Sequence, residues 1–266
     1  MYSKKSIFSG LMLETVKSVK MSRPSGRRKR RGETPEDQKK RNEAAKRKEL
    51  ERKLNANFKN GDHFLTLTYA EEPEQAEAEK DIARFFRRLR RKYKEGAKRY
   101  IYTMERGKVN GRIHFHVLLP QEIGLSAIIS AWEDMGIIND RPIYTAPLFG
   151  KLAEYILKGE KAFGKKAYIC GSGIAQPETK EETVKAKSFR AKPAETVKVK
   201  GRVYTLYGWE EHADPFTMDK VQTAVYYCLT SETAKKKGRE KQNGKDKRRG
   251  KTGQKEGRQE GRQASV

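Results

Sequence analysis

The chain has 266 residues, of which 35% are hydrophobic and 36% are charged, and its formal net charge at pH 7 is +25. So few apolar residues exclude a chain that packs entirely into one core, and so large a positive charge favours a polyanionic partner such as nucleic acid. There is no apolar run of the roughly 20 residues that cross a membrane, no apolar segment typical of a signal peptide and only two cysteines, so we expect a cytoplasmic protein with no membrane partner.

The N-terminal part is predicted to be a basic arm followed by a helix. Residues 1–33 end in the run Arg27–Arg31, which indicates a mobile basic segment. Thr34 then offers an N-cap, and a proline and two acids follow it. We therefore expect a helix from Thr34 to about Asn57. Its apolar stripe is thin, which predicts a helix on the protein surface or along DNA.

The next two elements are predicted to be a strand and an amphipathic helix. The run His63–Tyr69 is rich in β-branched and aromatic residues and predicts a strand. Over Asp81–Lys94 apolar residues recur at helical spacing. Arginines occupy the rest of this helix and are typical either of a solvated face or of a face that contacts phosphates; as candidate DNA-binding residues they are Arg84, Arg87, Arg88 and Arg91.

A β-hairpin with two histidines follows. Two runs rich in β-branched and aromatic residues flank the pair Asn110-Gly111, which is a strong hairpin signal. In the second run, alternate apolar side chains face a core and leave Arg112, His114 and His116 on the other face. Two imidazoles placed side by side can share one divalent metal, and Arg112 beside them is a candidate DNA-binding residue.

Glu105, in the first strand of this hairpin, is the candidate third ligand. With a two-residue turn it lies opposite His116, and with a four-residue loop it lies opposite His114. Directly opposed residues share a face, so both registers bring the carboxylate beside a histidine. The alternative is an exposed carboxylate that pairs with Arg106 or Arg112.

The remaining elements predict the fold class. We expect a helix around 125–132, an extended stretch over Ile137–Leu148 and a third helix over Phe149–Gly159. This order predicts an α+β fold with a central antiparallel β-sheet flanked by helices. Further on, the run 197–209 is β-like and Thr217–Thr230 is compatible with a helix. The chain is thus divided into an N-terminal arm and helix (1–56), a compact domain (57–180), an extension of uncertain structure (181–231) and a disordered basic tail (232–266).

Tyr155 on the third predicted helix is the candidate nucleophile. Lys151 and Lys158 lie on the same helical flank. Two ammonium groups favour the phenolate and attract a phosphodiester, which suits a tyrosine that attacks phosphorus. The alternative is a tyrosine that only packs at a helix boundary, and other tyrosines are less well placed: Tyr144, Tyr168, Tyr226 and Tyr227.

Together these residues predict one site. A divalent ion held by Glu105, His114 and His116 would act as a Lewis acid on a scissile phosphate. Tyr155 would then attack in line and leave a 3′-hydroxyl and a 5′-phosphotyrosine, with Lys158 steadying charge in the transition state. Oxygen and imidazole ligands suit Mn²⁺, and cellular supply favours Mg²⁺, so both are candidates.

Three motifs resemble those of the single-tyrosine rolling-circle replication initiators (Rep proteins) of the HUH endonuclease superfamily: Phe64–Tyr69, Gly111–His116 and Glu154–Lys158. The resemblance covers roughly residues 55–180. It implies an HUH/RRM-like fold and a metal-dependent DNA nicking-joining endonuclease, with Tyr155 as nucleophile, Lys158 in support and an acid as third ligand. The expected substrate is single-stranded or hairpin origin DNA. Two-tyrosine members carry a second tyrosine where this chain has Gly159, which implies one covalent link at a time.

Other functions are compatible with parts of this pattern. There is no Walker phosphate loop, so we expect a host helicase and polymerase as partners. Two histidines and a carboxylate also form the iron site of non-haem oxygenases, although the net charge of +25 argues against a small-molecule oxygenase. A transposase of the same superfamily and a non-catalytic basic nucleic-acid-binding protein remain alternatives.

Overall fold

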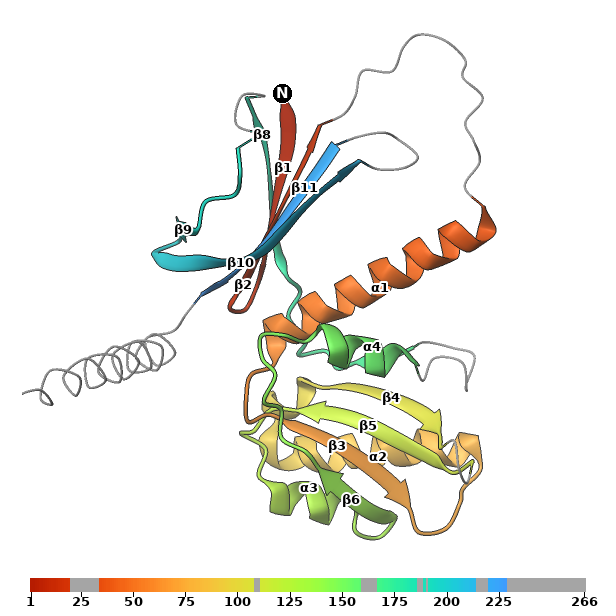
Figure 1. Ribbon diagram of the computed structural model, residues 1–266. Helices are drawn as coiled ribbons and strands as arrows, with labels where there is room; N and C mark the ends of the chain where they lie inside the picture. Colours follow the sequence, from red (N-terminus) through yellow and green to blue (C-terminus); the bar gives the residue numbers. More distant parts are fainter. Residues whose placement is uncertain are drawn as a thin grey trace, which may run out of the picture.

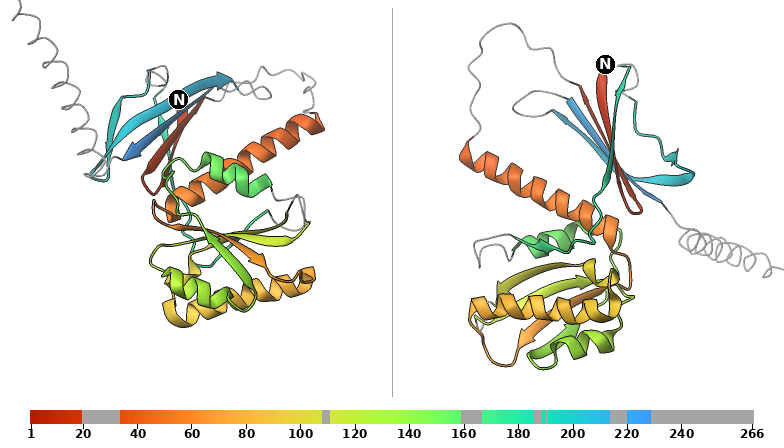
Figure 2. Two further views of the ribbon diagram at one scale, coloured as in Figure 1. Left: turned by 60° about the horizontal axis from the view of Figure 1, so that its bottom comes forward. Right: turned by 180° about the vertical axis from the view of Figure 1, so that it is seen from behind.

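The predicted α+β class is confirmed by the computed structural model. In the described residues, four α-helices accompany two antiparallel sheets, one of which is curled (Figure 1). Helices α2 and α3 cover one face of the first sheet, α4 and α1 lie over its other face, and the second sheet lies beyond α1 (Figures 1 and 2). The structure describes residues 1–19, 34–107, 111–158, 167–185, 189, 191–213 and 220–228.

The first sheet has five strands, and the central three were predicted. Glu105 pairs with His114 across the β4–β5 hairpin, and the Gly107 N–H donates to the Arg112 carbonyl at 2.8 Å. The register with a four-residue loop is therefore the one that forms. In spatial order the strands are β6 (Gly136–Asp140), β3 (His63–Tyr69), β5 (Ile113–Leu119), β4 (Ile101–Arg106) and β7 (Ile169–Cys170).

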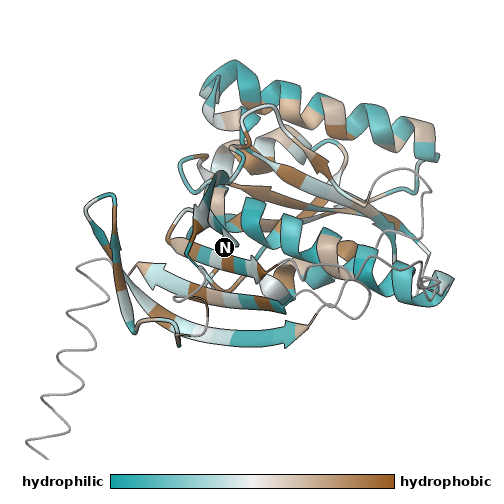
Figure 3. Cartoon of the chain, turned by 90° about the horizontal axis from the view of Figure 1, so that it is seen from above, coloured by the Kyte–Doolittle hydropathy of each residue, from teal (hydrophilic) through white to brown (hydrophobic). Residues whose placement is uncertain are grey.

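The main core lies between this sheet and helices α2 (Gln75–Tyr93) and α3 (Leu125–Trp132). Phe115 on β5, Phe85 on α2 and Trp132 on α3 are fully buried there. Hydrophobic and hydrophilic residues alternate along these elements as amphipathic elements require (Figure 3). Helix α2 begins earlier than predicted because its first turns are polar and carry almost no apolar stripe. A short 3₁₀ helix, η1 (Gly96–Lys98), follows α2.

The other face of the first sheet is covered by α1 (Pro35–Asn57) and α4 (Gly150–Lys158). The Asp37 N–H donates to Thr34 Oγ1 at 3.2 Å, so the predicted N-cap is confirmed. The first half of α1 is exposed, as expected for a surface helix. Its second half is not, because Leu50 and Leu54 are fully buried in the cluster that includes α4.

The second sheet corrects two predictions. The first nineteen residues form a β-hairpin rather than a basic arm, and a strand replaces the helix expected within Thr217–Thr230. The two ends of the chain thus pair in one sheet, with β2 hydrogen-bonded to β11. The spatial order is β8 (Glu178–Val184), β1 (Tyr2–Ser9), β2 (Met12–Val19), β11 (Lys220–Cys228), β10 (Arg202–Ala213) and β9 (Thr196–Val199).

Some predictions lie outside the described residues. These are the basic run Arg27–Arg31, the turn residue Asn110, the end of the third helix at Gly159 and the tail from residue 232. The division into domains stays a prediction.

The turn of the N-terminal hairpin joins the second sheet to α1. Gly10 has a φ of +60°, and a Cβ atom there would lie 2.0 Å from the backbone oxygen of Asn55. Arg52 Nη2 also donates to Glu14 Oε1 of β2 at 2.8 Å. This contact therefore leaves no room for a side chain at the turn.

We expect Gly10→Ala to destabilise the protein by about 2–4 kcal/mol, because it adds a backbone clash to the cost of a positive φ. Gly201→Ala is the matched control, since Gly201 has a φ of +76° with nothing within 4 Å of a Cβ, and it should cost only about 1 kcal/mol. Denaturant unfolding measures both. Equal losses would mean that the approach of the turn to α1 does not constrain the fold.

Candidate metal and tyrosine site

Strands β4 and β5 bring the three predicted ligands together. The Nε2 atoms of His114 and His116 lie 2.9 Å and 2.5 Å from Oε1 of Glu105. Strand alternation places both histidines on the face opposite the buried Phe115. The ligand atoms of the three side chains all lie within 4.8 Å of one another. The sequence pattern therefore identified a real cluster.

The second ring nitrogen of each histidine also has a partner. Thr66 Oγ1 on β3 lies 3.2 Å from Nδ1 of His116, and the Arg112 carbonyl lies 3.3 Å from Nδ1 of His114. An Nδ1–H bonded to such an oxygen leaves Nε2 as the ligand atom and fixes the ring orientation. One carboxylate oxygen and two oriented imidazole nitrogens are a donor set that suits a divalent transition metal such as Mn²⁺.

Hydrogen bonding sets the charges in the metal-free cluster. The bonds from His114 and then His116 lower the pKa of the Glu105 carboxyl from 4.5 to about 2. The bond to Glu105, with a smaller contribution from the Arg112 carbonyl, raises the pKa of His114. The cluster is thus a coupled acid–imidazole pair in which Glu105 stays ionised.

We expect this pairing to make the metal-free protein acid-sensitive. Because the folded-state pKa of Glu105 is lowered, its stabilising contribution is present above pH 4.5 and is lost as the pH falls towards 2. In the presence of a chelator, the melting temperature of the wild type should therefore exceed that of Glu105→Gln at pH 6, and the difference should shrink between pH 4.5 and 2. A difference that does not change with pH would contradict this assignment.

Tyr155 of α4 reaches the same cluster. Its hydroxyl lies 2.9 Å from Nε2 of His116, although the two residues are 39 positions apart. Phe64 holds both rings, since it stacks on His116 at a centroid distance of 5.4 Å and meets Tyr155 edge-on at 6.0 Å. His116 is 5% exposed, whereas Tyr155 is 45% exposed. The phenol is therefore both fixed against the cluster and accessible from outside.

A comparison with protein families identifies a relationship for this region. Residues 62–160 match the family model of a replication-associated protein of the ORF2 type. The match supports a replication initiator, and it spans both hairpin strands, the strand that carries Thr66 and the helix that carries Tyr155. No curated protein and no solved structure matches the chain. None of the helices in the described stretches combines the length and apolar character needed to cross a bilayer.

The environment of the Tyr155 phenol differs from the prediction. Burial, followed by the negative charge of Glu105, raises its pKa instead of lowering it. Lys158 lies beside Glu154, with Nζ 3.2 Å from Oε1, and lines a hollow between α1 and α4. Lys151 lines another hollow, towards the second sheet. The expected ammonium partners point along the outer flanks of α4 because the phenol turns inward to the sheet.

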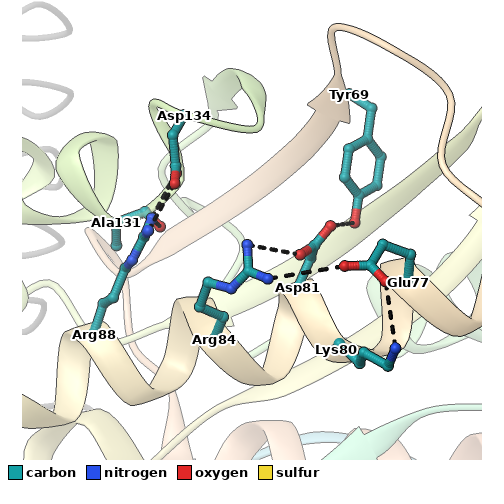
Figure 4. A network of polar contacts seen from close by, with 8 residues as sticks. All are labelled: Tyr69, Glu77, Lys80, Asp81, Arg84, Arg88, Ala131 and Asp134. Carbon is teal, nitrogen blue, oxygen red and sulfur yellow. Dashed lines mark hydrogen bonds and ion pairs between the residues drawn. The ribbon is translucent and has the colours of Figure 1, made fainter.

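The arginines of α2 lie on the face of the first sheet opposite the cluster. The Nη atoms of Arg88 meet both carboxylate oxygens of Asp134, at 2.5 and 2.7 Å, and Arg84 Nη1 lies 3.2 Å from Asp81 (Figure 4). Figure 4 also draws the bond from Tyr69 to Asp81. Two of the four arginines thus hold internal ion pairs, and DNA contact by Arg87 and Arg91 stays a prediction. Arg112 is exposed beside the cluster.

Arg141 was not predicted from the sequence. A groove of about 460 Å³ beside Tyr155 is lined by strands β3, β5 and β6, by helix α4 and by Arg141, just after β6. The positive charge of Arg141 acts on the Tyr155 phenol and opposes the rise in its pKa. No motif marked this residue, because only the β3–β6 pairing places it near the hairpin.

Other predicted alternatives lie elsewhere. Tyr144 is 77% exposed in the loop before α4, Tyr168 accepts a bond from Lys53 at 3.3 Å, and Tyr226 is buried in the second sheet. His63, predicted to be structural, contacts Asp140 at 2.7 Å and the Ile123 carbonyl at 3.0 Å. Tyr155 is the tyrosine that contacts the cluster in the described residues.

Proposed function

We propose that this protein is a rolling-circle replication initiator that nicks and rejoins single-stranded DNA through Tyr155. The observation that carries the proposal is the contact between the Tyr155 hydroxyl and Nε2 of His116, inside a cluster of two imidazoles and a carboxylate. The match of residues 62–160 to a replication-associated family supports the same role, as does the net charge of +25.

The covalent step is a transesterification. The phenolic oxygen of Tyr155 attacks the scissile phosphorus, a P–O bond to tyrosine forms, and the P–O3′ bond breaks. The phenolic proton passes to water and the leaving O3′ takes up a proton, so the products are a 3′-hydroxyl and a 5′-phosphotyrosine. The new ester keeps the energy of the broken one, so a second 3′-hydroxyl can reverse the step without ATP.

The residues around Tyr155 position this attack. Phe64 limits rotation of the phenol by packing on both rings, so less orientational freedom is lost on the way to the transition state. Mg²⁺ or Mn²⁺ bound by Glu105, His114 and His116 would supply Lewis-acid polarisation of the phosphate and would offset the Glu105 charge near the phenol.

Covalent adduct formation tests the proposal. Purified full-length protein is mixed with single-stranded hairpin DNA and Mn²⁺, the adduct is isolated under denaturing conditions, and mass spectrometry maps the modified residue. We expect one adduct, on Tyr155, with the 5′ end of the cleaved strand. An adduct on another tyrosine, or binding without any adduct over a range of origin-like hairpins, would overturn the proposal.

A further inference from the structure

The groove beside Tyr155 offers a cation that the proposed reaction has not yet used. One wall of the groove is Leu152 and Tyr155 of α4, and the floor includes Thr66 of β3 and His116 of β5. The opposite wall comes from the edge strand β6 and the residue that follows it. Two polar side chains stand there: Asn139 and Arg141.

The backbone fixes the position of Arg141. Its N–H donates to the Phe64 carbonyl at 3.0 Å, and the Phe64 N–H donates back to the Arg141 carbonyl at 3.2 Å. These two bonds extend the β3–β6 pairing beyond the end of β6. Phe64 is also the residue that packs on the Tyr155 ring. Arg141 is therefore held in register with the nucleophile by a rigid element rather than by a loose loop.

Strand alternation keeps the neighbouring acid away from this guanidinium. Asp140 lies between Asn139 and Arg141, so its side chain points to the opposite face of the sheet. There its Oδ2 contacts Nδ1 of His63 at 2.7 Å. Asp140 is thus committed to a buried histidine and does not neutralise Arg141.

Arg141 also differs from the arginines that stabilise the fold. Arg52, Arg84 and Arg88 each meet a carboxylate, whereas Arg141 makes none of the ion pairs found among the described residues and is exposed in the groove. A rigidly placed, unpaired guanidinium beside a nucleophile offers a planar fork of N–H donors, which matches the oxygens of a phosphodiester.

We propose that Arg141, assisted by the Asn139 amide, is a phosphate-binding subsite for the DNA strand that Tyr155 attacks; this rests on the proposed function. In this arrangement Tyr155 approaches the phosphorus from α4, and Arg141 holds the phosphate oxygens from the β6 side. Arg141 takes the place that the sequence had assigned to Lys151 and Lys158, whose side chains lie on the outer flanks of α4.

Binding without cleavage tests this subsite separately from the chemistry. In a Tyr155→Phe background and with a chelator present, the affinity for a fluorescent single-stranded 20-mer is measured from 50 to 300 mM salt. We expect Arg141→Ala to weaken binding about tenfold and to reduce the slope of log K against log salt by about 0.7, the value for one phosphate contact on a single strand. Arg141→Lys should keep the slope and recover only part of the affinity.

Arg202→Ala is the matched control, since Arg202 is exposed on β10 of the second sheet. It should leave affinity and slope near the wild-type values. An unchanged slope in Arg141→Ala, or equal losses in both variants, would overturn the subsite. In the Tyr155 protein with Mn²⁺, Arg141→Ala should also slow adduct formation at saturating DNA. If the wild type forms no adduct but Arg141→Ala still loses affinity and slope, the proposed reaction fails and the phosphate subsite stands.

Discussion

Tyr155→Phe should abolish covalent adduct formation, with a loss on the order of 10⁴-fold or more, while leaving DNA binding within about twofold of the wild type. The substitution removes only the hydroxyl that contacts His116 at 2.9 Å. The ring contacts with Phe64 remain possible, so α4 keeps its place against the sheet. Denaturing gel electrophoresis of the labelled adduct measures the reaction, and fluorescence anisotropy measures binding.

Tyr144→Phe is the control for this experiment. Tyr144 is 77% exposed in the loop that precedes α4, so its variant should react like the wild type. The stability of Tyr155→Phe should fall by no more than about 1 kcal/mol, the usual contribution of one hydrogen bond. If Tyr155→Phe still forms the adduct, the nucleophile is another group and the contact with His116 is only structural. If it loses binding as well, the protein is better described as a nucleic-acid-binding module.

The hairpin was predictable because its signal is local. An Asn-Gly pair fixes a reversal of the chain, and the two-residue period of Ile113, Phe115 and Val117 fixes which face the histidines occupy. The sequence left two registers open, and backbone pairing selected the one with Glu105 opposite His114. The alternative register would also have placed the carboxylate beside a histidine, so the cluster did not depend on resolving it.

The second sheet was not predictable in the same way. The first strand, Tyr2–Ser9, carries lysines and serines at positions that do not alternate with apolar residues, so it resembles a basic arm. The last strand, Lys220–Cys228, does carry β-branched and aromatic residues at Val221, Thr223 and Val225, and this β-propensity outweighed a weak helical pattern. Both strands are stabilised by pairing with a partner about 200 residues away, which no local pattern reveals.

The polar environment of the nucleophile was the least predictable part of the site. Helical spacing correctly grouped Lys151 and Lys158 with Tyr155, but it does not say which way the flank faces. The sheet decides this, because the phenol packs towards Phe64 and the lysines are left outside. The cation on the reactive side, Arg141, comes from an edge strand whose position depends on pairing with β3.

Removal of one metal ligand should separate the roles of the cluster. His114→Ala should lower the rate of adduct formation by at least about 10²–10³-fold, because the charge stabilisation that a bound divalent ion supplies is worth several kcal/mol. His114 is a better choice than His116, since His116 is buried against Phe64 and Thr66 and its loss would also disturb packing. A chelator should reduce the wild type to a similar level, and chelation should change His114→Ala little further.

Thermal unfolding provides the second measurement for the same variant. At Mn²⁺ concentrations 100 times the dissociation constant, the wild type should gain about 2.7 kcal/mol of stability, and His114→Ala should gain almost none. His212→Ala, an exposed histidine on β10 of the second sheet, should behave as the wild type in both assays. A metal-induced stabilisation that survives in His114→Ala would place the ion elsewhere. Full activity of the wild type in chelator would mean that the two histidines serve only to hold Glu105 and Tyr155 in place.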